Sequence, residues 1–205
     1  MPSQPPSIIL ASASPRRREL LATLGVTFEV VPSHVDESTD EGDPAVVAKV
    51  LARRKAEAVA ATHPGALVIG SDTVVVLDGR ILGKPGDAAE AREMLTSLRG
   101  RSHEVVTGVA VSFGGRALND HDRTVVHMRD YEDAAIEVFI ASGSPFDKAG
   151  GYAIQDEAFA PVARFEGCRC NVVGLPLATL RGLLAQFGVR TTRPEVECPV
   201  CGPAS

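Results

Sequence analysis

The sequence has no excess of positive charge and no apolar run long enough to cross a membrane. Its 21 lysine and arginine residues are outnumbered by 26 aspartate and glutamate residues, which gives a formal net charge of −5. Extended binding to nucleic acid needs an excess of cationic side chains, so the composition argues against a general nucleic-acid-binding protein. Without a long apolar run, we expect no membrane-spanning helix. Any binding site for an anion must therefore be local.

Internal repeats and low-complexity segments are also missing from the sequence. No basic stretch precedes the short apolar piece SIIL, so we expect no secretory signal peptide and a cytoplasmic protein. In that compartment the four cysteines would be thiols or metal ligands rather than disulfides. A chain of 205 residues can bury a substantial core, and we expect one α/β domain over residues 1–189. Residues 190–205 are expected to form a flexible tail.

Strand and helix patterns alternate along the chain, with hairpins between some of them. A short helix that Gly25 ends follows the apolar strand SIILAS, and a longer helix begins at Asp43. Asp78 and Gly79 predict a hairpin turn, after an apolar segment with a polar interruption at GSD. This order predicts an α/β fold with a mixed twisted sheet, helices on its faces, and two lobes around a cleft.

The stretch ASASPRRREL, residues 11–20, places three arginines at the start of a predicted helix. Ser14 is expected to cap that helix. The N-terminal end of a helix already carries positive character, so Arg16, Arg17 and Arg18 would be unfavourable there without an anion. Exposed N–H groups, hydroxyls and guanidinium groups at such a junction can form a phosphate cradle. The alternative is that Arg18 and one neighbour simply face solvent.

Asp72, in VIGSDTVVV, lies between two apolar strand segments. A carboxylate is costly to bury there unless it is paired or binds a metal. We expect it at a strand end, where it holds a divalent metal or activates water, with a turn-capping role as the alternative. Aspartyl-phosphate chemistry is excluded, because it needs a second aspartate where Val74 stands. Lys84 follows the hairpin and can return near Asp72; the alternative is an exposed loop lysine.

Four ordered blocks of the sequence are recognisable together: LASASPRRRELLATLGVTFEVVPS, IGSDTVVVLDGRILGKPGDAAEAREMLTSLRGRSHEVVTGVAV, DKAGGYAIQ and NVVGLPLATL. They resemble the Maf family of nucleoside triphosphate pyrophosphatases, from about Ile8 to about Phe187. The resemblance implies an inosine triphosphatase-like α/β architecture, commonly as a homodimer. It also implies hydrolysis of a nucleoside triphosphate to the monophosphate and pyrophosphate, with Mg²⁺ or Mn²⁺ as cofactor.

The resemblance further implies roles for individual residues. Asp72 would accept a proton during catalysis, and Glu37 would join Asp72 in binding the metal. Choice of substrate would depend on three residues, namely Arg16, Thr73 and Gln155. Phosphate contacts would come from a set of hydroxyl and cationic side chains: Ser12, Ser14, Arg16, Arg17, Lys55 and Lys84.

The sequence AIQ resembles the branch of the family that acts on dTTP and UTP. The amide of Gln155 can both donate to and accept from the imide edge of thymine or uracil. Ala153 and Asp156 stand where glycine is usual, and Asp156 is expected to place a charge beside the base. Two alternatives stay open: a house-cleaning pyrophosphatase for 7-methyl-GTP or other non-canonical purine nucleotides, and a nucleotide-binding regulator of septum formation.

The spacing of the cysteines raises the hypothesis of a zinc site. Cys198 and Cys201 have the spacing of half a zinc knuckle, and Cys168 and Cys170 could supply two further ligands. The alternative is a tail with incidental cysteines.

The five histidines show no metal-ligand spacing. His103 is expected as a polar edge residue at the start of a strand. His121 and His127 are expected on a solvated strand face.

Overall fold

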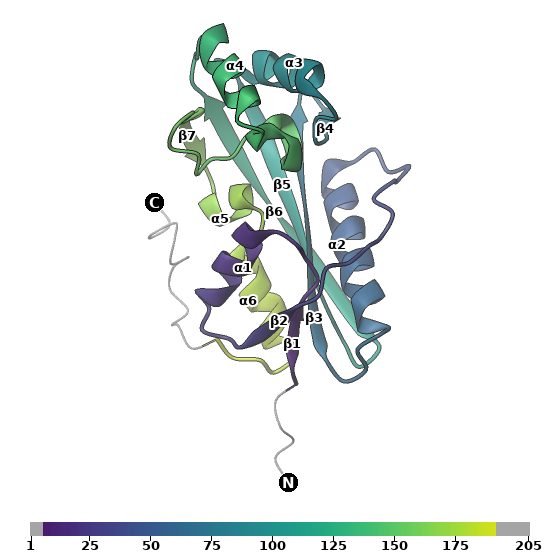
Figure 1. Cartoon of the computed structure of the whole chain (residues 1–205). Coiled ribbons are helices and arrows are strands. Elements are labelled where there is room, and N and C mark those ends of the chain that lie inside the picture. The colour runs from purple at the N-terminus through teal and green to yellow at the C-terminus, as the bar shows by residue number, and fades with distance from the viewer. Residues whose placement is uncertain (1–5, 192–205) are drawn as a thin grey trace.

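The computed structural model describes residues 6–191 of the chain (Figure 1). Its strands are β1 (Ile8–Leu10), β2 (Phe28–Val30), β3 (Leu67–Leu77), β4 (Arg80–Leu82), β5 (Ser102–Phe113), β6 (Arg116–Met128) and β7 (Val162–Glu166). Its helices are α1 (Pro15–Ala22), α2 (Pro44–Ala60), α3 (Ala88–Leu98), α4 (Asp133–Ala141), α5 (Arg169–Val173) and α6 (Leu177–Ala185), with the 3-10 helices η1 (Ser144–Asp147) and η2 (Ala149–Gly151). Within the described part of the chain, no helix is both long and apolar enough to span a membrane.

The seven strands form one mixed sheet, which confirms the predicted α/β class. The strand order is β2-β1-β3-β5-β6-β7, and β4 pairs with β3. Among the described strands, two pairs are parallel, β1 with β2 and β1 with β3. Along one edge of β3, β1 pairs with residues 67–69 and β4 pairs with residues 75–77. The edge over residues 70–74 pairs with neither of them, which leaves a gap in this side of the sheet.

Asp72 lies in the middle of β3, so the prediction of a strand end or a turn at this position is wrong. β3 stays continuous because its other edge pairs with β5 throughout, and Ser71 is opposite Val109. The ladder satisfies the backbone hydrogen bonds even where the side chains are polar. The predicted hairpin is confirmed, since Asp78 and Gly79 have φ angles of 51° and 76°, as a type I′ turn requires.

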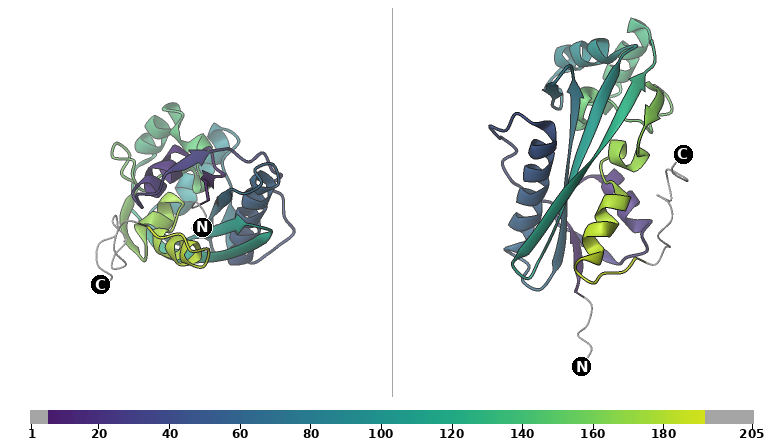
Figure 2. Two further views of the ribbon diagram at one scale, coloured as in Figure 1. Left: turned by 90° about the horizontal axis from the view of Figure 1, so that it is seen from below. Right: turned by 180° about the vertical axis from the view of Figure 1, so that it is seen from behind.

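Helix α2 covers one face of the sheet, and α1, α5 and α6 lie on the other (Figure 2). The approach of α2 is very close at two glycines of the sheet. A Cβ atom added at Gly70 would lie 2.2 Å from the carbonyl oxygen of Ala52, and one at Gly108 would lie 2.2 Å from that of Ala48. Glycine and alanine at this contact therefore let the backbones of helix and sheet approach each other.

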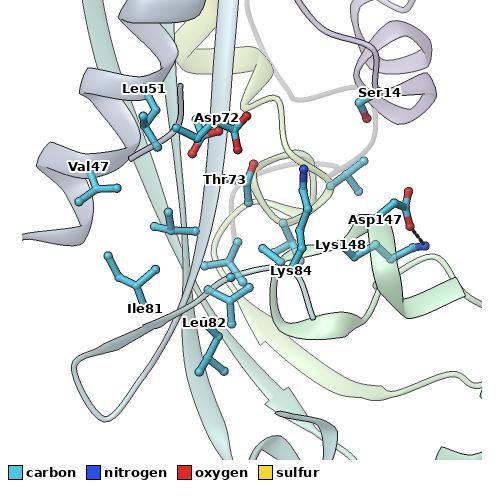
Figure 3. A pocket seen from close by; sticks show the side chains of 18 of the residues that line it. Ser14, Val47, Leu51, Asp72, Thr73, Ile81, Leu82, Lys84, Asp147 and Lys148 are labelled. Carbon is cyan, nitrogen blue, oxygen red and sulfur yellow. Dashed lines mark hydrogen bonds and ion pairs between the residues drawn. The ribbon is translucent and has the colours of Figure 1, made fainter. Parts of the chain in front are cut away.

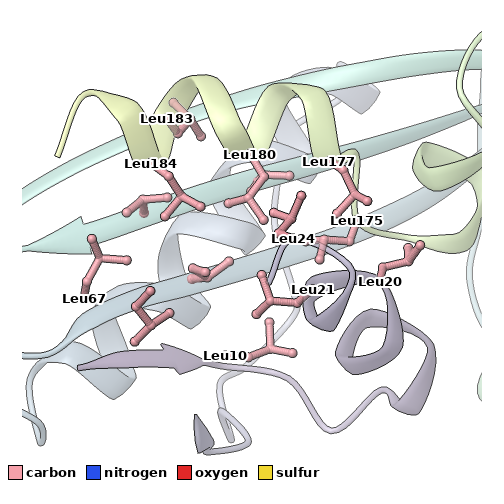
Figure 4. Packing of buried hydrophobic residues seen from close by; sticks show 14 of the residues in the cluster. Leu10, Leu20, Leu21, Leu24, Leu67, Leu175, Leu177, Leu180, Leu183 and Leu184 are labelled. Atoms are coloured by element: carbon pink, nitrogen blue, oxygen red, sulfur yellow. The ribbon is translucent and has the colours of Figure 1, made fainter. Parts of the chain in front are cut away.

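The face opposite α2 carries two apolar clusters, one towards each end of the long strands. The first packs α1 and α6 onto the sheet (Figure 4) and includes Leu10, Leu21, Leu24, Leu177 and Leu180. The second surrounds α3 and α4 and includes Leu95, Leu98, Ile136 and Phe139. Polar side chains of β3 and β5 lie between the clusters, among them Thr73 and Thr107, whose hydroxyl oxygens are 3.0 Å apart. The predicted two lobes correspond to these two clusters.

Candidate active site

A cleft of about 690 Å³ opens at the gap in the edge of β3. Its walls come from the start of α1, the loop before α2, α2 itself, the β3–β4 hairpin and residues 147–155. Most of the residues that the sequence analysis singled out line it: Ser14, Arg16, Arg17, Glu37, Lys55, Asp72, Thr73, Lys84 and Gln155. Figure 3 shows Lys84 extending towards Asp72 and Thr73, with Asp147 and Lys148 on the other side. The fold thus brings these distant segments together.

Two neighbouring residues of β3 reach the cleft from opposite faces of the sheet. Side chains alternate along a strand, so Asp72 points towards α2 and Thr73 towards α1. Asp72 contacts Lys55 of α2, whereas Thr73 contacts Arg17 of α1. Both side chains are accessible from one cleft because the strand edge between β1 and β4 is open.

Ser12 differs from the other predicted phosphate ligands, because it is buried and lies behind the cleft wall. Its hydroxyl oxygen accepts hydrogen bonds from the backbone N–H of Ser14, at 3.2 Å, and from Nη1 of Arg17, at 3.4 Å. In this structure Ser12 therefore supports two residues that line the cleft.

The three arginines of α1 have three different surroundings. The Ser14 side chain caps the helix as predicted, accepting from the N–H of Arg17. Successive side chains of a helix project about 100° apart, so three in a row cannot share one direction. Arg16 faces the cleft mouth and donates to Asp147 at 3.1 Å, Arg17 points inward, and Arg18 is exposed. Only Arg16 and Arg17 are placed to act on an anion in the cleft.

Arg17 is held by oxygen atoms of the protein. Its Nε donates to the carbonyl of Gly174 at 2.8 Å, its Nη1 to the carbonyl of Ser71 at 2.8 Å, and its Nη2 to the hydroxyl of Thr73 at 3.0 Å. Burial lowers the pKa of the Arg17 guanidinium, and the nearby charge of Asp72 opposes this shift. Arg17 thus ties α1, β3 and the α5–α6 connection into one rigid wall of the cleft.

Lys55 joins the two predicted metal ligands. Its Nζ is 2.6 Å from Oδ1 of Asp72 and 2.6 Å from Oε1 of Glu37. Lys55 and Asp72 are only 8% and 7% exposed, so each charge needs the other. Partial burial acts to raise the pKa of Glu37, but the hydrogen bond and charge of Lys55 hold it below its usual range. Two carboxylates and one ammonium group therefore meet at the base of the cleft.

Asp147 is a cleft residue that the sequence analysis missed. Its carboxylate pairs with Arg16 at 3.1 Å and with Lys148 at 2.5 Å, across the cleft mouth. Burial acts to raise the pKa of Asp147, but the hydrogen bonds from Lys148 and Arg16 lower it. No local pattern marks Asp147, because its partner Arg16 lies 131 positions away.

Comparisons with known proteins agree with this arrangement of residues. The model of the family described as Maf-like protein matches residues 7–187. The chain belongs to the Maf family. A relative from Thermomicrobium roseum is 51% identical over 199 residues, covering 95% of this chain and 91% of its own. A relative from Pelotomaculum thermopropionicum is 50% identical over 184 residues, which cover 88% of this chain and 96% of the relative. Both relatives are named dTTP/UTP pyrophosphatase.

Two solved structures show a weaker likeness to this Maf family chain. One is a nucleoside-triphosphatase, or dITP/XTP pyrophosphatase, from Mycobacterium abscessus, with a TM-score of 0.41, 19% identity, and coverage of 61% of this chain and 75% of its own. The other is the Ham1 protein of Staphylococcus aureus, with a TM-score of 0.39, 15% identity, and coverage of 60% and 72%. The α/β class of this family member is shown by its own sheet and helices.

Gln155, the predicted base-recognition residue of this Maf family chain, lies on a tight turn at the cleft. The N–H of Asp156 donates to the carbonyl of Ala153 at 3.2 Å, which closes the turn around Gln155. The Asp156 carboxylate accepts from the N–H of Phe159 at 2.8 Å, so it caps its own loop. Asp156 is not among the residues that line the cleft.

His103 is the second residue of β5, which confirms the predicted position at the start of a strand, but β5 is a central strand, so the prediction of a polar edge residue is wrong. The strand pairs with β3 on one side and β6 on the other, and His103 is 3% exposed. Its Nε2 lies 2.6 Å from the hydroxyl oxygen of Tyr152, which lines the cleft. A local pattern could not show this burial, because it depends on which strands flank β5. His121 and His127 are partly exposed on β6, close to the prediction.

The zinc prediction falls partly outside the described residues, where Cys198 and Cys201 lie. Cys168 is the N-cap residue of α5, and Cys170 is buried in the cluster around α1 and α6. Within residues 6–191, no three histidine, cysteine, aspartate or glutamate side chains form a group that could hold a metal ion. The zinc site therefore stays a prediction.

Proposed function

We propose that this chain hydrolyses dTTP and UTP to the corresponding monophosphates and pyrophosphate. The observation that carries the proposal is a buried carboxylate, Asp72, in one cleft with the cationic side chains of Arg16, Arg17, Lys55 and Lys84. A protein that only binds phosphates gains nothing from a carboxylate there, whereas hydrolysis needs a base. Relatives about 50% identical over most of the chain carry the name dTTP/UTP pyrophosphatase, which supports the choice of substrate.

The triphosphate is proposed to lie between the start of α1 and Lys84. The helix N-terminus, the Ser14 hydroxyl and the Lys84 ammonium group are all suited to phosphate oxygens. Arg16 reaches the same space once its guanidinium exchanges Asp147 for a phosphate. These fixed donors stabilise the charge that develops on the departing pyrophosphate.

Asp72 is proposed as the general base. The oxygen of a water molecule attacks the α-phosphorus, and the proton of that water passes to the Asp72 carboxylate. The bond from the α-phosphorus to the bridging oxygen breaks, and pyrophosphate leaves with the electron pair. Lys55, 2.6 Å from Oδ1, holds the carboxylate in place for this transfer.

The donor set at the base of the cleft fits Mg²⁺ or Mn²⁺. Both cations prefer oxygen ligands, and Mg²⁺ is commonly held by one or two carboxylates together with substrate phosphates. Asp72 and Glu37 would supply those carboxylates, since both already converge on the cationic Nζ of Lys55. When bound, such a cation polarises phosphoryl oxygens and offsets their negative charge.

Base selection is proposed to fall to Gln155 together with Arg16 and Thr73. The Gln155 amide can accept from N3–H of thymine or uracil and donate to a neighbouring carbonyl. Apolar residues that also line the cleft, Ile154 and Val173 among them, suit the flat faces of a base. Thr73 would act through Arg17, which its hydroxyl contacts at 3.0 Å.

A panel of nucleoside triphosphates incubated with the protein and Mg²⁺, with products identified by chromatography, tests the proposal. We expect dTMP or UMP and pyrophosphate from dTTP and UTP. Release of pyrophosphate chiefly from 7-methyl-GTP, ITP or XTP would favour a house-cleaning pyrophosphatase for purine nucleotides. Nucleotide binding without turnover would favour a nucleotide-binding regulator.

Asp72→Asn should abolish turnover while the protein stays folded. Glu57→Gln, on the outer surface of α2, is the control and should stay active. Near-normal activity of Asp72→Asn would contradict the assigned base.

Two further parts of the proposal rest on expectation from the sequence and the family. These are a homodimeric state, which light scattering on the purified protein tests, and a cytoplasmic location, which fractionation of cells tests.

A further inference from the structure

The turn that carries Gln155 is anchored at both ends by contacts behind the cleft wall. At its start, the hydroxyl oxygen of Tyr152 lies 2.6 Å from Nε2 of His103, and the two rings meet edge to face at 5.3 Å and 84°. At its end, Asp156 accepts from the N–H of Phe159, whose ring stacks on Phe139 at a centroid distance of 4.3 Å. Between these anchors the turn presents its residues to the cleft.

The chain just before Tyr152 is the short 3-10 helix η2, in which the N–H of Gly151 donates to the carbonyl of Lys148 at 3.0 Å. Gly150 and Gly151 have φ angles of 68° and 72°, in the left-handed region that glycine adopts readily. One backbone hydrogen bond, from the N–H of Gly150 to the carbonyl of Gly83 at 2.9 Å, ties this segment to the hairpin. These backbone contacts hold the segment before the turn, and the Tyr152 side chain with its partner His103 adds the buried side-chain contact at the start of the turn itself.

His103 has no direct role open to it in the chemistry. It is 3% exposed and is not one of the residues that line the cleft. Burial lowers the pKa of the His103 ring to about 4, so the ring is neutral at neutral pH and adds no charge to the phosphate site. It extends from β5 on the same face as Val105, opposite the face from which Asp72 reaches α2.

We propose that His103 is a positioning residue for nucleobase recognition, which acts by holding Tyr152 and, through it, the turn that presents Gln155. The inference rests on the proposed function and deepens it. The His103–Tyr152 bond selects the orientation of the amide that reads the base, and leaves the phosphate side of the cleft unchanged.

Three variants and one matched control test this role. His103→Phe and Tyr152→Phe both remove the hydrogen bond, and His103→Gln restores a donor and an acceptor at this position. Tyr131→Phe is the control: the Tyr131 hydroxyl donates to the carbonyl of Leu95 at 2.8 Å in the same apolar cluster, but Tyr131 does not line the cleft. Each phenylalanine variant loses one buried hydrogen bond, so a purely structural role predicts the same outcome for all of them.

Steady-state kinetics with dTTP, UTP and CTP are measured for each variant, together with inhibition by inorganic tripolyphosphate, which has no base. For His103→Phe and Tyr152→Phe we expect the KM for dTTP to rise about fivefold with kcat changed by less than about twofold. Discrimination between UTP and CTP should weaken, inhibition by tripolyphosphate should keep its wild-type constant, and His103→Gln should recover most of the loss. A further variant that combines His103→Phe with Tyr152→Phe should resemble either single variant, because both substitutions remove the same bond.

The inference is overturned if both phenylalanine variants keep the wild-type KM and preference, or if Tyr131→Phe changes them equally. An equal weakening of tripolyphosphate inhibition also overturns it, because the effect would then lie at the phosphate end. If His103→Phe does not fold, Tyr152→Phe alone decides between these outcomes. The substrate panel of the wild-type protein tests the proposed function separately from this inference. If the wild type prefers another nucleotide to dTTP and UTP, the variants are compared on that nucleotide.

Discussion

Replacing Gly108 with alanine is expected to displace helix α2 and to weaken the catalytic site with it. Gly108 lies opposite Asp72 in the pairing of β5 with β3, directly beneath α2. The added Cβ would lie 2.2 Å from the carbonyl oxygen of Ala48 and 2.7 Å from the backbone nitrogen of Lys49. These are backbone atoms of a helix and cannot rotate away, so the helix itself must move.

The size of the effect follows from that contact. Restoring an ordinary separation needs a shift of α2 by roughly 1 Å, and overpacking of this kind costs about 3 kcal/mol of unfolding free energy. For a domain of this size the melting temperature should fall by roughly 6–12 °C. The same shift disturbs the 2.6 Å contact between Lys55 and Asp72. A misplacement of that extent should lower kcat/KM by about tenfold or more.

Thermal unfolding followed by circular dichroism, and kcat/KM with dTTP, measure the two effects. Gly182→Ala is the matched control, since Gly182 is exposed on α6 and nothing lies within 4 Å of an added Cβ. This control should raise stability by up to about 1 kcal/mol and leave activity unchanged. Gly108→Ala with a wild-type melting temperature would refute the close seating of α2. A lower melting temperature with full activity would refute its coupling to the site.

Three more predictions concern pH, the cleft mouth and the metal. Burial lowers the pKa of His103 from 6.5 to about 4, so the unfolded chain binds its proton more readily. The free energy of unfolding therefore keeps its full His103 contribution above about pH 6.5 and falls by about 3 kcal/mol as the pH drops to about 4. Denaturant titrations of the wild type and of His103→Gln at about pH 6.5 and about pH 4 should show this loss in the wild type alone. Asp147→Asn should change stability by less than about 0.5 kcal/mol, because the carboxylate is 61% exposed. It should lower the KM for dTTP about twofold by freeing Arg16, and a higher KM would contradict this competition. Removing divalent cations with EDTA should abolish hydrolysis, and added Mg²⁺ or Mn²⁺ should restore it; turnover that survives EDTA would contradict a metal held by Asp72 and Glu37.

Local features of this protein were readable from its sequence. Ser14 caps α1 and Asp43 caps α2 through contacts with residues two or three positions away, so the pattern itself contains both partners. The Asp78–Gly79 turn is likewise local, since it depends on backbone conformations that these two residues tolerate. Most of the candidate site residues stand in the sequence blocks that resemble the Maf family, whereas Glu37 and Lys55 lie outside those blocks and follow from the resemblance itself. All of the candidate residues except Ser12 line the cleft.

Only the tertiary structure decided how those residues act together. Asp72 sits in an unbroken strand at a gap in the sheet edge, because β1 and β4 pair with different parts of β3. Asp147 meets Arg16, and His103 is buried against Tyr152, through partners between 49 and 131 positions away. Strand order and register set these meetings, and both are properties of the whole chain. The sequence by itself determined the caps, the turns and the chemistry available; the packing of distant segments determined which charges are paired, buried or free to meet a substrate.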